Sequence, residues 1–279
     1  MAPRARTISN TVAMGVLWTS AIVTVGILFA LIAYVFINGI AQISLDFIFG
    51  YPRGLNSEGG IWPTIVASVY VTGLAMVIVT PIAILAAVYL SEYAHQGRMV
   101  KAIRFAADSL AAIPSIVLGL FGLALFVEAL GLKFSVLSGA LALAFLMLPI
   151  VMRTTEEAIR AVPRYIRWGS YGLGATKWQT VRRVVLPAAM PRVLTGIILA
   201  TGRAVGETAV VIYTMGTMIN TPISPLDPGR SMTVHLYILS TEGINLLAAY
   251  GTALLLMVMI LGFNLTARLI VRRSRRLSE

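Results

Sequence analysis

The stretch TGIILATGRAVGETAVVIYTM, residues 195–215, decides the fold class, because it is long and apolar enough to cross a lipid bilayer. Two charged residues, Arg203 and Glu207, nevertheless lie near its middle. A charge at the centre of a bilayer costs about 2.5–3.5 kcal/mol. Because the two residues are four positions apart, a continuous helix would place them on one face, where they can pair. We therefore expect this face to point toward other helices or a water-filled pathway, and not toward lipid.

The composition indicates an integral membrane protein. The chain has 279 residues, of which 58% are hydrophobic and 12% charged, and its mean hydropathy is +0.87. An average soluble domain is about one-quarter charged. The absence of cysteine excludes disulfides, thiol catalysis and thiolate metal sites. The net charge of +11 could suggest a nucleic-acid partner. However, the basic residues cluster in loops between apolar runs, which is the pattern of membrane topology and argues against nucleic acid.

Long apolar runs predict an all-α polytopic membrane protein with six transmembrane helices. Each run has about the 20 residues that are needed to cross the hydrocarbon layer. The runs cover residues 12–38, 62–90, 105–130, 134–152, 193–218 and 246–271. Helices are expected because lipid cannot satisfy free backbone groups. The runs are too long and too uniformly apolar for barrel strands, which would alternate over about ten residues.

The positions of the basic residues predict the orientation. Of the 22 lysines and arginines, only Arg53, Lys133 and Arg230 fall in loops on one side, while Arg203 lies within a span. All the others lie on the other side, so the positive-inside rule places both termini in the cytoplasm. We divide the chain into residues 1–61 with the first span and first outer loop, a transmembrane domain over 62–271, and a basic tail over 272–279.

The longest inner segment, residues 153–192, has the punctuation of a helix, a break and a second helix. Thr154 or Thr155 can cap the first helix, two glycines break it, and Thr176 can cap the second. Prolines that follow oppose a continuous helix into the fifth span. Such a long, structured loop suggests a docking surface for a cytoplasmic partner. The alternative is a basic amphipathic loop that lies on anionic lipid headgroups.

Part of this segment resembles the EAA loop of ABC importer permeases. Gly174 is followed after nine residues by Val184, and then by Leu186-Pro187, as in the G-x9-I-x-LP half of that loop. The Glu-Ala-Ala half is replaced by Trp168-Gly169-Ser170. In the family this loop forms a coupling helix that docks in a cleft of the ATP-binding subunit. The resemblance therefore implies that the docking residues are Trp168, Gly169, Ser170, Tyr171, Gly172, Leu173, Gly174, Ala175 and Thr176.

Four further segments together resemble the permeases of phosphate-specific ABC importers, and the length favours the PstA-type subunit. They are GGIWPTIVASVYVT, TPIAILAAVYLSEYA, AAIPSIVLGLFGLALF and TGRAVGETAVVIYTMG. The resemblance implies a type I ABC importer permease fold in the cytoplasmic membrane of a prokaryote. It also implies three partners: a PstC-type permease, a dimer of ATP-binding subunits, and an extracytoplasmic phosphate-binding protein. No cofactor is expected in this chain, since the partner ATPase would bind ATP and Mg.

The charged residues of the fifth span suit an anion pathway. Phosphate is a compact anion that needs compensating charge in a low-dielectric region. Arg203 is permanently charged and can bind phosphate oxygens with two parallel hydrogen bonds. We expect Glu207 to neutralise Arg203 when no anion is present, and Gly206 to lie in the same pathway. The alternative is a purely structural ion pair between helices.

Other classes of function remain open at this stage. The chain has no G-x-x-x-x-G-K-[ST] nucleotide loop, and its two histidines, His95 and His235, fall in loops on opposite sides. A permease for sulfate or molybdate is the nearest alternative, because one arginine recognises charge more than identity. A secondary transporter driven by an ion gradient is the rival from another class. An intramembrane enzyme is a further competing class, and a purely structural subunit would leave the charged span unexplained.

Overall fold

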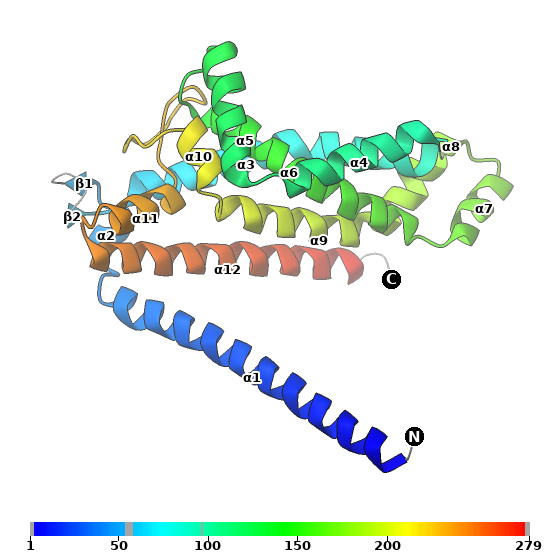
Figure 1. Ribbon diagram of the computed structural model, residues 1–279. Helices are drawn as coiled ribbons and strands as arrows, with labels where there is room; N and C mark the ends of the chain where they lie inside the picture. Colours follow the sequence, from blue (N-terminus) through cyan, green and yellow to red (C-terminus); the bar gives the residue numbers. More distant parts are fainter. Residues whose placement is uncertain (1–2, 54–57, 96, 277–279) are drawn as a thin grey trace.

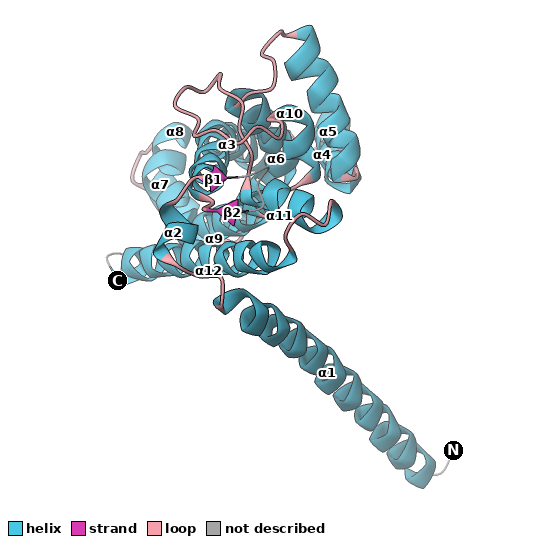
Figure 2. Cartoon of the chain, turned by 90° about the vertical axis from the view of Figure 1, so that its left-hand side faces the viewer, coloured by secondary structure: helices cyan, strands magenta, loops and turns pink. Residues whose placement is uncertain are grey.

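The computed structural model describes residues 3–53, 58–95 and 97–276, and these are almost entirely helical (Figure 1). The helices are α1 (Pro3–Ile40), α2 (Leu45–Phe49), α3 (Trp62–Val88), α4 (Arg98–Ala112), α5 (Ser115–Gly122), α6 (Val136–Arg160), α7 (Arg164–Gly172), α8 (Lys177–Thr180), α9 (Leu186–Val205), α10 (Ala209–Thr214), α11 (Met232–Thr241) and α12 (Leu246–Arg276). Three π-helical segments extend or join them: η1 (Tyr89–Tyr93), η2 (Leu123–Ala129) and η3 (Val181–Val185). Two short strands, β1 (Pro52–Arg53) and β2 (Glu58–Gly59), pair antiparallel (Figure 2).

Among the described residues, five helices are long and apolar enough to cross a membrane, and a sixth span exists only if α4 and α5 are counted together. The spans predicted over 12–38, 62–90, 134–152 and 246–271 coincide with α1, α3, α6 and α12. The predictions over 105–130 and 193–218 are wrong as single helices, because the structure breaks both.

The first break lies at Pro114. Helix α4 ends at Ala112 and α5 begins at Ser115, with an angle of 101° between the two helices. Proline has no backbone N–H and pushes the residue before it out of the helical region. Ile113 accordingly has φ −68° and ψ 131°. As a result α5 runs across the direction of the long helices, whereas α4 lies along it (Figure 1).

The second break lies at residues 206–208, within the stretch that decides the fold class. Helix α9 ends at Val205, Gly206 caps it, and α10 begins only at Ala209. Glycine is a poor helix former, and threonine favours caps over helix interiors. Helix α10 then packs against α5 and α6.

The core of the bundle is the contact of α3 with α6. One face of α3 carries small or β-branched side chains at every fourth position, and all of them are buried. They are Ala67, Val71, Ala75, Val79, Ala83 and Ala87. Between membrane helices, association depends on van der Waals packing, which small residues favour by allowing close approach. This ladder therefore explains why α3 and α6 form the rigid centre.

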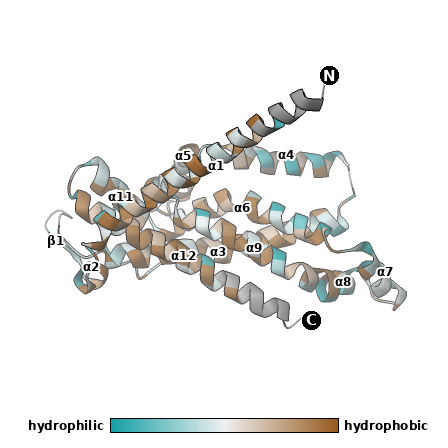
Figure 3. Ribbon diagram, turned by 90° about the horizontal axis from the view of Figure 1, so that it is seen from below, coloured by the Kyte–Doolittle hydropathy of each residue, from teal (hydrophilic) through white to brown (hydrophobic). Residues whose placement is uncertain are grey.

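The bundle has two distinct ends. The α7 end holds α7 and α8, the chain end of α12 and the first residues of α1, whereas the α11 end holds α2, α11 and both strands (Figure 1). Hydrophilic residues gather on α4, α7 and α8, while the long helices are mostly apolar (Figure 3). Helix α1 leans away from the bundle and is exposed over most of its described side chains. The element therefore presents its apolar surface to lipid or to another subunit.

Candidate functional site

The break in the fifth span separates Arg203 from Glu207, the two charged residues that were predicted to form an ion pair. Arg203 lies in the last turn of α9 and is exposed, while Glu207 lies beyond the helix end and is half-buried. Both residues are among those described, and no ion pair joins them. Instead, Glu207 Oε1 accepts a long hydrogen bond of 3.5 Å from the backbone N–H of Val210. The predicted pairing is wrong because it assumed one continuous helix.

The freed backbone at this break is bonded to a different helix. The side-chain hydroxyl of Thr233, in α11, donates to the backbone carbonyl of Glu207 at 2.9 Å. Thr233 Oγ1 also lies 2.8 Å from the hydroxyl of Ser231, the residue that caps α11. Irregular backbone at membrane depth is tolerated where it is buried in protein or lines a wet cavity. The break therefore brings hydroxyl, carbonyl and carboxylate groups together beside Arg203.

Arg203 and Gly206 present an open, cationic surface. A Cβ atom added at Gly206 would come no nearer than 3.7 Å to the neighbouring carbonyls of Arg203 and Gly202, so the backbone there is not crowded. The carbonyl end of α9 carries partial negative charge, which favours the cation of Arg203 in the last turn. An exposed arginine among apolar helices cannot face lipid cheaply. This surface is therefore suited to face a second subunit or a water-filled path.

The close helix contact of α9 lies at Gly196. A Cβ atom at Gly196 would overlap the hydroxyl oxygen of Thr154 on α6. At Gly202 the nearest atom would be 3.8 Å away, on Asn264 of α12. The spacing of the glycines in the sequence did not distinguish these two environments. Gly196 is therefore the residue that lets α9 approach α6.

The loop that follows α6 has the predicted break at Gly172 and Gly174, but the first helix begins elsewhere. The expectation that the following prolines oppose a continuous helix is wrong, because the helical segment from Lys177 to Val205 runs through them into the fifth span. Helix α6 runs without interruption through Thr154 and Thr155 to Arg160, so the predicted cap at those threonines is wrong. The Thr154 hydroxyl instead donates to the backbone of Ile150 within the helix, at 2.9 Å. The predicted cap of the second helix is confirmed, since Thr176 and Gln179 form a reciprocal capping box.

The segment from α7 to α8 carries the residues expected to dock a partner, and it projects from the bundle (Figure 1). Gly174 has φ +80°, a conformation that glycine adopts without strain, and this turns the chain between the two helices. The hydroxyls of Ser170 and Thr180 lie 2.9 Å apart across the turn. The exposed large side chains are Tyr165, Trp168, Tyr171, Leu173 and Trp178. A cluster of exposed apolar side chains indicates an interaction site, and docking itself stays a prediction.

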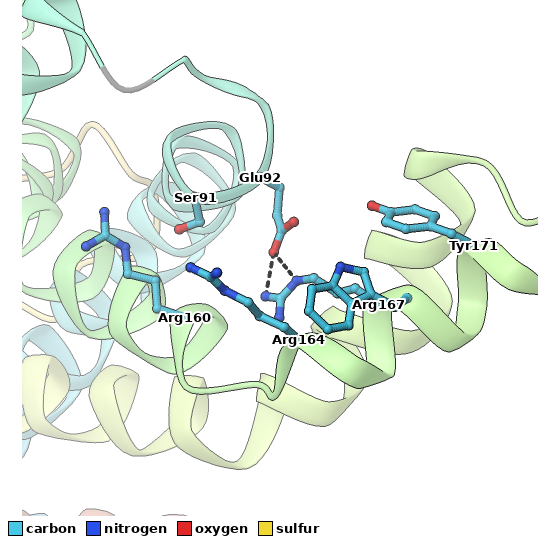
Figure 4. Close-up of a pocket in the computed structure, with 7 residues that line it drawn as sticks. Ser91, Glu92, Arg160, Arg164, Arg167 and Tyr171 are labelled. Carbon is cyan, nitrogen blue, oxygen red and sulfur yellow. Dashed lines mark hydrogen bonds and ion pairs between the residues drawn. The ribbon is translucent and has the colours of Figure 1, made fainter.

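A cleft of about 640 Å³ lies between α7 and the ends of α3 and α6 (Figure 4). Its lining residues are Ser91, Glu92, Arg160, Arg164, Arg167, Trp168 and Tyr171. At its base, Arg167 of α7 forms an ion pair with Glu92 of η1, with Nη2 2.7 Å from Oε1. This pair was not predicted from the sequence, because 75 residues separate its members and no local pattern connects them.

Further ion pairs tie α4 to α6. Glu156, which is buried, accepts Arg104 of α4 at 2.7 Å and Arg160 of its own helix at 2.6 Å. Asp108 of α4 pairs with Arg153 of α6, and both side chains are more exposed than Glu156. Among the described residues, no three histidine, aspartate or glutamate side chains could hold a metal ion. Ion pairs therefore join α4 to α6 and α7 to η1.

The comparisons with known proteins agree on one family. The family model of the binding-protein-dependent transport system inner membrane component matches residues 79–276. The chain is 35% identical to the "Probable ABC transporter permease protein YqgI" of Bacillus subtilis (strain 168), over 94% of this chain and 95% of that protein. It is 37% identical to the "Phosphate transport system permease protein PstA 1" of Mycobacterium tuberculosis (strain ATCC 25618 / H37Rv), over 81% of this chain and 76% of that protein.

Solved structures show the same fold. A bacterial ABC transporter involved in the import of the acidic polysaccharide alginate matches with a TM-score of 0.64 at 15% identity, over 97% of this chain and 96% of that chain. An inward-facing structure of the MetNI methionine ABC transporter matches with a TM-score of 0.59 at 21% identity, over 77% of this chain and 94% of that chain. The expected class, a type I ABC importer permease fold, is confirmed. The chain is a multi-pass membrane protein and belongs to the family of binding-protein-dependent transport system inner membrane components.

Proposed function

We propose that this chain is the PstA-type permease subunit of an ATP-driven importer of inorganic phosphate. Its relatives include several proteins named phosphate transport system permease protein PstA, at 33–37% identity over most of the chain. The observation that carries the proposal is the exposed Arg203 at the break of the fifth span. A permanent cation at that depth has a function only if an anion or a counter-charge meets it.

In this proposal Arg203 binds the phosphate anion. Its planar guanidinium offers paired donors to phosphate oxygens, and its charge offsets the loss of hydration. Since Glu207 is not paired with Arg203, the cation is available without first breaking an ion pair. Glu207 then acts at the edge of the path, where it disfavours a second anion, and Gly206 keeps the backbone accessible.

The path is incomplete in one subunit, because Arg203 is exposed on the surface of the chain. We infer that a second permease of PstC type covers this face and closes the pathway. An ATP-binding subunit dimer docks on α7 and α8, binds ATP and Mg, and supplies the energy. An extracytoplasmic phosphate-binding protein delivers the substrate to the α11 end. Both termini and α7 then lie in the cytoplasm of a prokaryote, in agreement with the positive-inside rule.

The proposal is tested by Arg203→Gln in the full transporter, reconstituted in liposomes with its binding protein. We expect phosphate uptake to fall by about 10- to 160-fold, because loss of a charged hydrogen-bonding group costs about 1.5–3 kcal/mol. The complex should still assemble. Arg98→Gln is the matched control, because Arg98 is an exposed cation at the start of α4, away from the break.

Uptake at the normal rate by Arg203→Gln would overturn the role of Arg203. Uptake of sulfate or molybdate, with no phosphate uptake by the wild type, would replace phosphate by that oxyanion. Uptake that persists without ATP and collapses with the ion gradient would indicate a secondary transporter instead. The three results are distinguishable in one assay with labelled anions.

A further inference from the structure

Segment η1, the π-helical end of α3, contacts both helices of the projecting segment, α7 and α8. We propose that η1 is the joint through which movement of that segment reaches the membrane helices, with Glu92 and Tyr93 as its positioning residues. The inference rests on the proposed function only in assuming that an ATPase moves α7 and α8. It goes further by naming the side chains that pass this movement to the core.

The first contact is the ion pair of Glu92 with Arg167. The Nε and Nη2 atoms of Arg167 donate to the same carboxylate oxygen, Oε1, at 3.0 and 2.7 Å. The two side chains are only 9% and 15% exposed, so water competes little for their charges. Charge-assisted hydrogen bonds are roughly twice as strong as neutral ones. The pair therefore holds α7 to the end of α3.

The same guanidinium also holds the end of α6. Nη1 of Arg167 donates to the backbone carbonyl of Val162 at 2.7 Å, and Nη2 donates to that of Ile159 at 2.9 Å. These carbonyls belong to the last turn of α6 and the bend that follows, and that of Ile159 also accepts the backbone N–H of Val162 at 3.2 Å. One side chain therefore connects three helices: α7, which carries it, α6 and α3 (Figure 4).

The second contact joins η1 to α8. The Lys177 ammonium lies 4.9 Å from the ring centroid of Tyr93, which is the distance of a cation–π interaction. Since the Ser170 and Thr180 hydroxyls also meet, α7 and α8 are linked to each other as well as to η1. Both α7 and α8 are therefore held by the same five-residue segment, η1.

The π-helical geometry explains why the adjacent residues Glu92 and Tyr93 reach two different helices, α7 and α8. In η1 the backbone N–H of Ala94 donates to the carbonyl of Tyr89, five residues earlier, at 2.8 Å. A π turn adds one residue relative to an α turn, which rotates the following side chains by about 100°. Leu90 stays buried in the core, while Glu92 and Tyr93 point to α7 and α8. Such single π turns are frequent at functional sites.

The core then carries the movement onward. Above η1, α3 presents its ladder of small buried side chains to α6 over most of the length of both helices. A displacement of η1 cannot be absorbed by side-chain motion in a close-packed interface of this kind. It must move α3 together with α6. A pair that only stabilised the fold would affect assembly and stability, but not the number of anions moved per ATP.

The test uses the complete transporter in liposomes, with the binding protein, and measures both anion uptake and ATP hydrolysis. For Glu92→Gln we expect ATP hydrolysis to continue while the phosphate transported per ATP falls by about tenfold, the scale of one charged hydrogen bond. Tyr93→Leu should lower this ratio, whereas Tyr93→Phe keeps the ring and should not. Asp108→Asn is the matched control, because it removes an ion pair between α4 and α6 outside the joint.

A cross-link gives the reverse experiment, because the wild-type chain has no cysteine. In the double variant Glu92→Cys, Arg167→Cys, a short thiol cross-linker with an internal disulfide should restore the transport ratio, and reductant should abolish it again. A normal ratio of phosphate transported to ATP hydrolysed in Glu92→Gln, or no effect of the cross-linker, would contradict the proposed role of η1.

The stimulation of ATP hydrolysis by the binding protein is a readout that does not depend on the anion. If the wild type fails to import phosphate, the proposed substrate is wrong, and this stimulation still tests the joint. We expect Glu92→Gln to lose most of it and Asp108→Asn to keep it. Equal stimulation in both variants would count against the joint whichever anion is transported.

Discussion

The two ends of the bundle stabilise their helices by different chemistry. At the α7 end, guanidinium groups meet carboxylates. The pairs are Glu92 with Arg167, Glu156 with Arg104 and Arg160, and Asp108 with Arg153. At the α11 end the contacts are mostly between hydroxyls, carbonyls and backbone N–H groups, such as the 2.7 Å bond from the Met232 N–H to the Ser68 hydroxyl.

The α11 end nevertheless contains one buried cation. Arg230 is 7% exposed, and its Nε donates to the backbone carbonyl of Thr217 at 2.6 Å. Its Nη1 lies 3.4 Å from Nδ1 of His235. In the part of the chain that the structure describes, no carboxylate lies within ion-pair distance of Arg230. Burial lowers the pKa of Arg230, and the charge of Glu242 opposes this shift.

Because of this difference, the two ends should be destabilised by different conditions. A cation paired with a carboxylate keeps its partner over a wide range of pH, so the α7 end is sensitive to salt and to the removal of a partner. A buried cation next to a neutral imidazole is different. Any proton that binds to the imidazole places two positive charges side by side in a low-dielectric site. The α11 end is therefore the one that acid should weaken.

The largest expected effect is this acid sensitivity. Burial, and second the charge of Arg230, lower the pKa of His235 from 6.5 to about 4. Between those two pH values the unfolded chain binds a proton that the folded chain excludes. The contribution of neutral His235 to the free energy of unfolding is therefore fully present above pH 6.5. It declines as the pH falls toward 4, by about 3 kcal/mol for a shift of this size. Unfolding in detergent micelles as a function of pH measures it.

His235→Asn is the matching variant, since an amide oxygen can take the place of Nδ1 without titrating. Its stability should change much less over the same window, and its curve should cross that of the wild type. An equally steep acid slope in His235→Asn would show that another group is responsible. The charged group recorded beside His235 is Arg230, and a guanidinium keeps its proton throughout that window.

The sequence could predict the long helices of both ends but not the breaks between them. Length and hydropathy were sufficient for α1, α3, α6 and α12, because those helices obey only the thickness of the bilayer. Pro114 is a local cause of the break in the third span, but the angle of 101° depends on what α5 packs against. The break after Val205 depends on the Thr233 hydroxyl, which satisfies the Glu207 carbonyl from 26 residues away.

The site divides in the same way. Arg203, Gly206 and Glu207 were found because charge in an apolar run is a local signal, and the cap at Thr176 follows from the local spacing to Gln179. The pairing of Arg203 with Glu207 failed because it extended a local rule across a break. Glu92 and Arg167 carried no signal, since the folding of α3 against α6 alone brings them together.

The next effect in size belongs to the α7 end. Glu156→Gln removes the carboxylate with which both Arg104 and Arg160 pair and puts a neutral amide in its place. Because Glu156 is buried but the arginines are partly exposed, we expect a loss of about 2 kcal/mol in the free energy of unfolding, below the 3–5 kcal/mol of a fully buried pair. Denaturation in mixed micelles at constant pH measures the loss.

Glu157→Gln controls for the change of net charge. Glu157 is the adjacent residue of α6, it is exposed, and no ion pair is recorded for it among the described residues. We expect its free energy of unfolding to stay within about 0.5 kcal/mol of the wild type, as for other surface substitutions. If Glu157→Gln were as unstable as Glu156→Gln, the loss would arise from net charge and not from the pairs of Glu156.

The smallest effect is expected for Asp108→Asn, which breaks the exposed pair with Arg153 at the same end. The side chains of the two residues are 42% and 51% exposed, so water already solvates both charges. Exposed pairs contribute about 0.2–1 kcal/mol, and 1 M salt reduces the screening length to about 3 Å. Asp108→Asn should therefore differ from the wild type only at low salt, whereas Glu156→Gln should remain less stable at 1 M. If the two variants responded to salt alike, burial would not be what separates the pairs of the α7 end, and the contrast with the α11 end would rest on pH alone.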